Sequence, residues 1–210
     1  MPGTSSPSIP AWREAARWAR RKGMEIRRSL ARGPARARAN AQLNWREFWH
    51  GRLALRSFPR HVQVGTNWTC NLKCSFCRLT QEETQARLRP LPTQEREISP
   101  RVFEALLDLL PYAEFFQLTP LGEPLLWSRL PELLERYQAL GLENLALTTN
   151  GQALARHSWA ERLVRARVRR IFVSIDSCDP GTYASMRVGG RLDQAEAGLE
   201  ALNAEKRRLG

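Results

Sequence analysis

The sequence has no run of 18 apolar residues, and its first residues lack the apolar core of a secretory signal peptide. Neither a transmembrane helix nor a secretion signal is therefore predicted, and we expect a soluble, cytoplasmic protein. Hydrophobic residues make up 42% of the 210 residues, which is enough for one sizeable core or two small ones.

Cysteine is scarce and unevenly placed. Three of the four cysteines, Cys70, Cys74 and Cys77, lie in the stretch TCNLKCSFC at residues 69–77. Four cysteines do not form a disulfide framework in a chain of this length, and the three in this stretch are poorly placed to pair among themselves. Their spacing, C-x3-C-x2-C, indicates metal or redox chemistry instead.

Acidic residues are scarce only near the amino terminus. Residues 1–60 carry 14 Lys and Arg against three Glu, whereas residues 61–210 carry 19 Lys and Arg against 18 acidic residues. A groove that follows nucleic-acid phosphates needs basic side chains across the folded body, and that body is nearly neutral. We therefore expect a basic, partly disordered or helical extension over residues 1–60 and a folded domain over residues 61–210.

Two features stand out within the extension. Residues 11–38 are rich in Arg and Ala, and three interpretations are open: a basic helix that contacts nucleic acid or an anionic membrane, an Arg-rich targeting leader, or a solvated extension. We favour the solvated extension. A cluster of aromatic residues is predicted to pack a short helix onto the domain: Trp45, Phe48, Trp49 and Phe58.

Strands and helices alternate from His61 onward. Four strands are predicted, one opened by Val62 and Val64 and three at residues 115–118, 145–149 and 171–175. Helices are predicted at residues 102–110 after a Ser99-Pro100 cap, at 130–140, at 152–167 and at 192–209. The second, third and fourth strands begin 30 and 26 residues apart, which is the length of a βαβ unit, so the sheet should be parallel.

Four strand-helix units indicate an α/β fold, either part of a β/α barrel or an open doubly wound sheet. Parallel sheets place their chemistry at the carboxyl ends of the strands. The segments that follow the four predicted strands are the cysteine stretch, TPLGEP (119–124), TTNG (148–151), and the pair Ser174 and Asp176. We expect these polar and glycine-bearing segments to meet at one edge of the sheet.

The number of cysteines bears on what they bind. Structural zinc is nearly always held by four protein ligands, commonly from paired elements, and the sequence has no second pair beside the trio. Cys178 is about a hundred residues away, in a segment that follows another strand. Three thiolates that hold a cubane iron–sulfur cluster would leave one iron open to a substrate or cofactor. We favour the cluster, and a zinc site or a structural trio remains an alternative.

The stretch CNLKCSFC resembles the C-x3-C-x2-C motif of the radical S-adenosylmethionine (SAM) enzymes, including the aromatic Phe76 before the last cysteine. The resemblance implies that Cys70, Cys74 and Cys77 hold a 4Fe-4S cluster and that SAM binds the fourth iron. It also implies reductive cleavage of SAM to a 5′-deoxyadenosyl radical, which abstracts hydrogen from a substrate. The fold implied is a partial (β/α)6 TIM-barrel-like core of about four βα units, with a basic helical N-terminal extension.

Other segments strengthen this resemblance. LGEPLL at residues 121–126 is similar to the family's GGEP motif, which implies that Gly122 and Glu123 contact the SAM amine; Leu121 departs from the usual first glycine. The TTNG and VSID segments resemble strand ends that contact the ribose or carboxylate of SAM. By this resemblance the contacts come from Asn150, Ser174 and Asp176.

Residues 174–190 resemble the segment after the fourth strand in the SPASM/twitch subgroup, whose extra C-terminal domain often carries auxiliary clusters. The resemblance places Arg187 near the SAM carboxylate, a pairing suited to a guanidinium. Cys178 has no place in the shared motif, and we expect a packed or incidental thiol. Residues 78–99 lack clear periodicity and either fold over the cluster or form a solvated loop.

The family core usually has six strand-helix units, so we interpret the chain as the front portion of a longer protein or a truncated gene. The resemblance implies an electron donor such as flavodoxin or ferredoxin and a substrate that is a peptide, a protein or a small metabolite. One alternative is an activase or cofactor-biosynthesis enzyme of the same family. An alternative of another class is a metal-binding module whose basic leader contacts nucleic acid or membrane.

Overall fold

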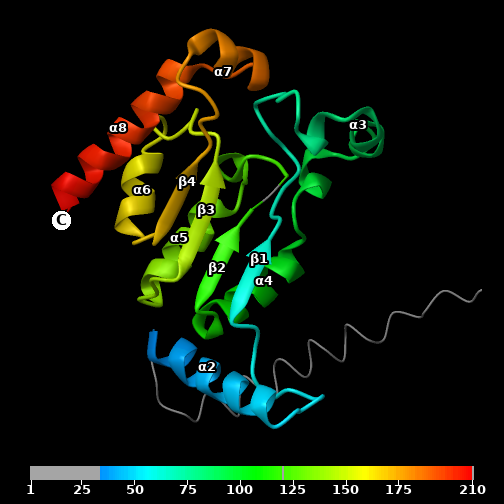
Figure 1. Cartoon of the computed structure of the whole chain (residues 1–210), viewed down its shortest axis with the longest axis vertical. Helices are drawn as coiled ribbons and strands as arrows, with labels where there is room; N and C mark the ends of the chain where they lie inside the picture. Colours follow the sequence, from blue (N-terminus) through cyan, green and yellow to red (C-terminus); the bar gives the residue numbers. More distant parts are fainter. Residues whose placement is uncertain (1–33, 120, 210) are drawn as a thin grey trace, which may run out of the picture.

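The computed structural model describes residues 34–119 and 121–209, which form a parallel sheet, flanking helices and short 3-10 turns (Figure 1). The strands are β1 (His61–Val64), β2 (Phe115–Leu118), β3 (Leu145–Thr149) and β4 (Arg170–Val173). The helices are α2 (Pro34–Trp49), α3 (Glu82–Leu88), α4 (Pro100–Leu109), α5 (Leu130–Ala139), α6 (Trp159–Arg165), α7 (Pro180–Met186) and α8 (Leu192–Leu209). The 3-10 turns are η1 (Arg78–Thr80), η2 (Thr93–Arg96), η3 (Leu110–Tyr112) and η4 (Pro124–Leu126).

The sheet has the order β1-β2-β3-β4, and every neighbouring pair is parallel. The parallel sheet predicted from the strand spacing is thus confirmed, and β2 and β3 have the bounds that the sequence predicts. Strand β4 spans 170–173 rather than 171–175, so Ser174 and Asp176 lie just beyond its carboxyl end. All four strands direct their carboxyl ends toward the same edge.

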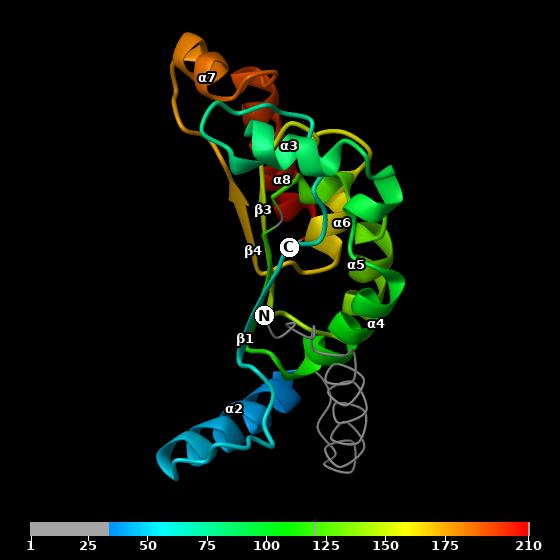
Figure 2. The ribbon, with the colours of Figure 1, turned by 90° about the vertical axis from the view of Figure 1, so that its right-hand side faces the viewer.

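Helices α4, α5 and α6 lie on one face of the sheet, and no helix of the described part covers the other face (Figure 2). A doubly wound sheet has helices on both faces, so this arrangement is that of a partial β/α barrel. The core between sheet and helices includes Phe103, Phe116, Leu133, Leu147 and Leu163, all fully buried or nearly so.

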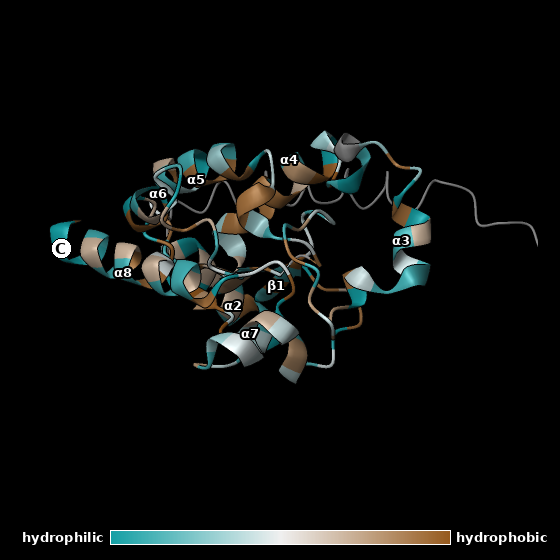
Figure 3. Ribbon diagram, turned by 90° about the horizontal axis from the view of Figure 1, so that it is seen from above, coloured by the Kyte–Doolittle hydropathy of each residue, from teal (hydrophilic) through white to brown (hydrophobic). Residues whose placement is uncertain are grey.

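Helix α8 packs on α6, and seen from above its turns alternate between hydrophilic and hydrophobic residues (Figure 3). No helix in the described part is long and apolar enough to cross a membrane.

The predicted helix over 152–167 is wrong at its start. Residues 152–158 form turns, and α6 begins only at Trp159, because His157 and Ser158 have positive φ angles of 54° and 57° that are incompatible with an α-helix. Leu154 is nevertheless fully buried, as its apolar character suggests. Helix α7 was not predicted; it begins after Asp179, whose carboxylate accepts a hydrogen bond from the Thr182 N–H.

The predicted packing of the aromatic cluster is wrong for three of its four members. Phe58 is buried and stacks on Tyr112 with ring centroids 4.4 Å apart. Trp45, Phe48 and Trp49 are exposed on the outer side of α2 and contact one another instead. These three residues are exposed because α2 packs on the domain through another face, whose buried positions include Ala37 and Ala41.

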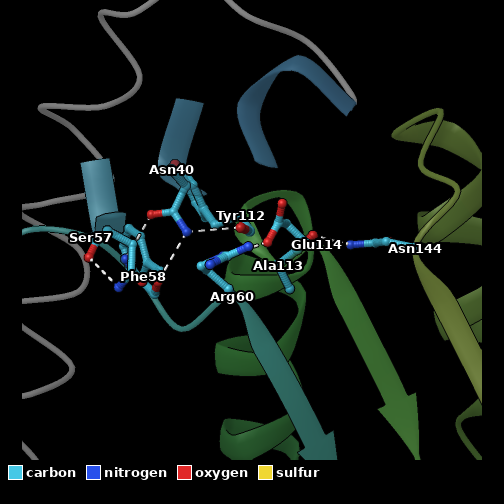
Figure 4. Close-up of polar contacts among 9 residues, drawn as sticks. Asn40, Ser57, Phe58, Arg60, Tyr112, Ala113, Glu114 and Asn144 are labelled. Atoms are coloured by element: carbon cyan, nitrogen blue, oxygen red, sulfur yellow. Dashed lines mark hydrogen bonds and ion pairs between the residues drawn. The ribbon is translucent and has the colours of Figure 1, made fainter. Parts of the chain in front are cut away.

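Helix α2 crosses the amino ends of the strands and is fixed there by buried amides (Figures 1 and 4). The Asn40 amide nitrogen donates to the carbonyls of Phe58 and Tyr112, and its oxygen accepts from the Phe58 N–H. Residues 11–33 of the predicted basic segment lie outside the described residues. The boundary between an extension and a domain at residue 60 stays a prediction.

Candidate metal centre

The cysteine trio lies on the loop that leaves the carboxyl end of β1. Cys74 is buried, Cys70 and Cys77 are half-buried, and all of the chain's cysteines are free thiols. Cys178 is exposed on the segment between β4 and α7, so it is not packed, contrary to one of the two expectations for it. Among residues 34–119 and 121–209, no three His, Cys, Asp or Glu side chains form a group that could hold a single metal ion.

Each of the three sulfurs faces an N–H donor. The Leu72 N–H lies 3.4 Å from the Cys70 sulfur, and the Leu79 N–H lies 3.4 Å from the Cys77 sulfur. The Cys74 sulfur is 3.7 Å from Nη1 of Arg187. Hydrogen bonds to sulfur stabilise thiolates and tune iron–sulfur clusters. The donor set therefore fits a cluster held at its corners by three thiolates.

The cysteine loop is docked on the segment that follows α7. The N–H of Lys73 donates to the Val188 carbonyl at 2.8 Å, and the N–H of Ser75 donates to the Met186 carbonyl at 3.0 Å. These bonds join residues more than a hundred positions apart. They hold the loop between β1 and the chain that leads into α8, so the position of Cys74 depends on both.

Arg187 lies at the centre of this docked region. Its Nε atom forms a hydrogen-bonded ion pair with Asp176, and its guanidinium carbon lies 5.2 Å from the centre of the Phe76 ring. Burial lowers the pKa of Arg187, but the Asp176 and Cys74 contacts outweigh burial and leave the pKa raised. Arg187 is therefore a fixed positive charge beside the Cys74 sulfur. The structure brings together Phe76, Asp176 and Arg187, which the sequence nominated separately.

Glu123 joins the ends of two strands. Its carboxylate accepts hydrogen bonds from the Thr149 hydroxyl at 2.6 Å, the Asn150 N–H at 2.8 Å and the Leu125 N–H at 3.2 Å. Only 2% of Glu123 is exposed, and this burial raises its pKa against the effect of the three hydrogen bonds. The buried carboxylate has no ion pair in the described part of the chain, so an external cation would be attracted to this position.

Gly122 approaches the backbone beside the first cysteine. A Cβ atom built on Gly122 would lie 2.3 Å from the Thr69 carbonyl oxygen, a distance that real Cβ atoms do not show. The Glu123 N–H donates to the same carbonyl at 2.8 Å, and the Asn67 side chain bridges the Thr69 and Glu123 carbonyls. Glycine is required here because the β2 loop packs directly on the cysteine loop.

Asn150 links the end of β3 to Cys70. Its side-chain nitrogen donates to the Asn71 side-chain oxygen at 2.9 Å and lies 3.8 Å from the Cys70 sulfur. Ser174 contributes through its backbone, whose N–H donates to the Thr149 carbonyl. The pKa of Cys70 is raised, chiefly by burial, and Glu123 adds to the effect. Asn150 is therefore positioned at the sulfur, whereas the Ser174 side chain is one strand farther along the sheet.

Sequence reasoning missed Asn67, Asn71 and Thr149 as parts of this network. Thr149 and Asn71 stood inside quoted motifs, and Asn67 follows the first strand by three residues. A polar residue in the segment that leaves a predicted strand was the available signal for Asn67. Its partners on the β2 loop could not be derived from spacing.

Residues 78–99 are partly ordered into short helices, and they are hydrogen-bonded to the chain that leads into the cysteine loop. They contain η1, α3 and η2, and Leu79 is buried. The Trp68 N–H donates to the Arg96 carbonyl at 2.8 Å, and the Ile98 N–H donates to the Thr66 carbonyl at 2.9 Å. This segment thus pairs with the chain that leads into the cysteines.

Comparisons with known proteins match this architecture. The family model of the Radical SAM superfamily matches residues 69–208. The GTP 3′,8-cyclase of Xanthomonas campestris pv. campestris (strain B100) is 36% identical over 148 residues, covering 68% of this chain and 41% of that protein. The GTP 3′,8-cyclase of Paracoccus denitrificans (strain Pd 1222) is 30% identical over 152 residues, covering 71% of this chain and 42% of that protein. The chain thus spans about two fifths of the length of these relatives.

The fold is also similar to that of Streptococcus suis SuiB. The crystal structure of SuiB bound to the precursor peptide SuiA has a TM-score of 0.56 and 19% identity, covering 98% of this chain and 38% of that chain. The structure bound to S-adenosylmethionine has a TM-score of 0.54 and 20% identity, covering 79% of this chain and 36% of that chain.

Proposed function

Because the chain belongs to the radical SAM superfamily, an enzyme family that uses a 4Fe-4S cluster and SAM, we propose that it generates a radical for hydrogen abstraction from a peptide, protein or small metabolite. The observation that carries this proposal is the set of three N–H-supported cysteine sulfurs beside Glu123, Asn150 and Arg187 at one edge of a parallel sheet. When bound, the cluster would supply an electron to SAM. The cleavage of SAM would then yield methionine and a 5′-deoxyadenosyl radical.

In this proposal Cys70, Cys74 and Cys77 hold the cluster and leave one iron without a protein ligand. The loop that carries them is fixed before Cys70, by Gly122 and Glu123 against Thr69, and on both sides of Cys74, by the backbone bonds to residues 186–188. The protein's contribution is to position the cofactors and to exclude water from them.

Glu123 attracts the SAM amine in this proposal. A carboxylate has about four lone-pair positions, and three donors from the chain occupy Glu123, which leaves room for one more. An ammonium group at that position would offset the cost of burying the carboxylate. Glu123 therefore both joins the strand ends and selects a cationic ligand group.

Arg187 attracts the SAM carboxylate. A guanidinium has five N–H donors, and those bonded to Asp176 and Cys74 leave others available to a carboxylate. Asp176 acts here by orienting Arg187, and Phe76 supports the guanidinium from its ring face. Ser174 and Asn150, at neighbouring strand ends, are proposed to contact the ribose or carboxylate.

The comparisons support two classes of substrate, a nucleotide and a peptide. The sequence relatives are named for a reaction on GTP, which supports the alternative of a cofactor-biosynthesis enzyme, whereas the SuiB structure is titled as bound to a precursor peptide. The SPASM/twitch-like segment at 174–190 does not separate the two classes, so our proposal keeps a peptide, a protein or a small metabolite as the substrate. An electron donor such as flavodoxin or ferredoxin is proposed to reduce the cluster.

The test is anaerobic reconstitution with iron and sulfide, followed by dithionite and SAM, with 5′-deoxyadenosine measured by mass spectrometry. We expect product with the native chain, loss of product with Cys74→Ala, and retention with Cys178→Ala, which removes the exposed thiol outside the site. A chain that binds about one zinc and no sulfide would contradict the proposal. Adding GTP or a candidate precursor peptide and assaying its consumption then separates the two substrate classes.

A further inference from the structure

A cavity of about 640 Å³ lies at the amino ends of the strands, on the opposite edge of the sheet from the cysteines. Its walls are the first turns of α2 and the residues that lead into β2, β3 and β4. The volume is within the range of small-molecule sites in proteins, roughly 300–1,000 Å³. The proposed radical chemistry does not use this cavity.

The cavity wall carries more positive than negative charge once ion pairs are taken into account. Of its acidic residues, Glu143 pairs with Arg167 at 3.0 Å and Glu114 pairs with Arg60 at 2.5 Å. The two other arginines of the wall, Arg38 and Arg169, form no ion pair within the described part of the chain, and both are exposed.

A buried amide in the wall has an unused acceptor. Asn144 is 7% exposed, and its side-chain nitrogen donates to the carbonyls of Leu110 and Ala113 at 2.9 and 2.7 Å. Carbonyl oxygens only accept, so these two bonds fix the orientation of the amide. The Asn144 Oδ1 atom is left buried without a hydrogen-bond partner.

Asn40 shows what a satisfied amide looks like in the same region (Figure 4). Its nitrogen donates to two carbonyls, as that of Asn144 does, but its oxygen also accepts from the Phe58 N–H at 2.8 Å. Leaving a buried acceptor unpaired is costly, so an acceptor with no partner in the protein is usually bonded to water or to another bound molecule. Asn144 is part of the cavity wall, so a molecule in the cavity can supply this partner once a small movement of the wall uncovers the oxygen.

A ligand for this cavity needs three properties. It must carry an anion for Arg38 and Arg169, a hydroxyl or N–H group that donates to the Asn144 oxygen, and carbon atoms that pack on the apolar wall formed by Leu142 and Val168. An ionised carboxylate alone has no donor. A phosphate monoester of a sugar or nucleoside has all three, and arginine recognises phosphate through paired N–H donors.

We propose that the cavity beneath α2 binds a small phosphate monoester that also carries hydroxyl or N–H donors, as sugar phosphates and nucleotides do. The phosphate lies against Arg38 and Arg169, and a donor group of the ligand pairs with the Asn144 oxygen. This site is separate from the cofactor site and does not depend on the proposed function.

Binding is measured on the 210-residue chain by titration calorimetry with ribose 5-phosphate, methyl phosphate and inorganic phosphate. We expect one saturable site for ribose 5-phosphate, weakened at least about tenfold by Arg38→Gln or Arg169→Gln, because bonds to charged groups contribute about 1.5–3 kcal/mol. Arg87→Gln, which removes an exposed arginine of α3 at the other edge of the sheet, is the matched control and should leave the affinity unchanged.

Asn144→Ala would also remove two buried hydrogen bonds, so the role of Asn144 is measured in the native chain by the NMR shift of its side-chain amide during titration. That amide should shift with ribose 5-phosphate, and methyl phosphate, which has no donor, should bind more weakly. Absence of saturable binding, or equal weakening by Arg87→Gln, overturns the proposal. Equal affinity for ribose 5-phosphate and inorganic phosphate overturns its assignment to a sugar or nucleoside ester.

Discussion

The guanidinium of Arg187 lies 3.7 Å from the sulfur of Cys74, although 113 positions separate the two residues in the sequence. The same guanidinium pairs with Asp176 and lies over the ring of Phe76. One side chain therefore connects the segment after α7, the end of β4 and the cysteine loop. Its charge acts on whatever the cysteine sulfurs hold.

Replacing Arg187 should change the reduction potential of the cluster. A nearby cation stabilises the more negative reduced state, so Arg187→Gln should shift the midpoint potential to more negative values. A loss of about 1 kcal/mol of attraction corresponds to roughly 40 mV for a one-electron couple. The measurement is a redox titration followed by electron paramagnetic resonance.

Arg191→Gln is the control for this shift, because Arg191 lies on the same segment and its side chain pairs, among residues 34–119 and 121–209, only with the exposed Asp193. It should leave the potential unchanged. A potential that moves equally in both variants would show that the contact between Arg187 and Cys74 has no specific effect.

Gly122→Ala should disrupt the cysteine loop. The added Cβ would lie 2.3 Å from the Thr69 carbonyl, so one of the two loops must move, at an expected cost of about 1–3 kcal/mol. We expect a lower iron and sulfide content after reconstitution as well as lower stability. Gly65→Ala is the matched control, because its Cβ would meet nothing within 4 Å and it precedes the same loop. Equal iron content in the two variants would contradict the close packing.

Glu123 should make the stability of the cofactor-free chain depend on pH. Burial raises its pKa above the ordinary value of 4.5, so the folded chain binds this proton more tightly than the unfolded chain. The resulting stabilisation is present below pH 4.5 and is lost as the pH rises through the raised pKa. Urea denaturation across this range should give a falling free energy of unfolding.

The matched variants for this dependence are Glu123→Gln and Glu135→Gln. The first removes the titrating group and should flatten the slope, and the second removes an exposed carboxylate of α5 and should preserve it. An unchanged slope in Glu123→Gln would assign the pH dependence to another group.

Two glycines in helices should respond to alanine with opposite signs. A Cβ on Gly198 of α8 would lie 2.7 Å from the Gly151 carbonyl oxygen, so Gly198→Ala should destabilise the chain by about 1–3 kcal/mol. Gly181 of α7 has its nearest neighbour at 3.5 Å, so Gly181→Ala should be neutral or stabilising by up to about 1 kcal/mol. Thermal unfolding distinguishes these outcomes, and a stable Gly198→Ala variant would contradict the packing of α8 on the β3 end.

The strands could be predicted from the sequence because short apolar runs between turn signals specify them locally. Strands β2 and β3 have the predicted bounds, and Ser99 caps α4 as expected through a bond to the Val102 N–H. The start of α6 could not be predicted, because the left-handed conformations at His157 and Ser158 have no local sequence signal. Tertiary packing overrides helical periodicity there.

The candidate site was predictable only in its parts. The cysteine spacing nominated the trio, and the resemblance to radical SAM motifs nominated Glu123 and Arg187. Contacts such as that between Arg187 and Cys74 depend on how distant segments pack, and no periodicity encodes them. The unpaired oxygen of Asn144 likewise becomes visible only when its two carbonyl partners are in place.

The most direct test of the account is the electron paramagnetic resonance spectrum of the reduced, reconstituted chain with and without SAM. Three cysteine ligands leave one iron open, so we expect about four irons and four sulfides per chain and a spectrum that changes when SAM binds. Cys178→Ala should give the same result, and Cys70→Ala should not. A cluster whose spectrum is indifferent to SAM, or whose fourth iron is held by a side chain of this protein, would contradict the account.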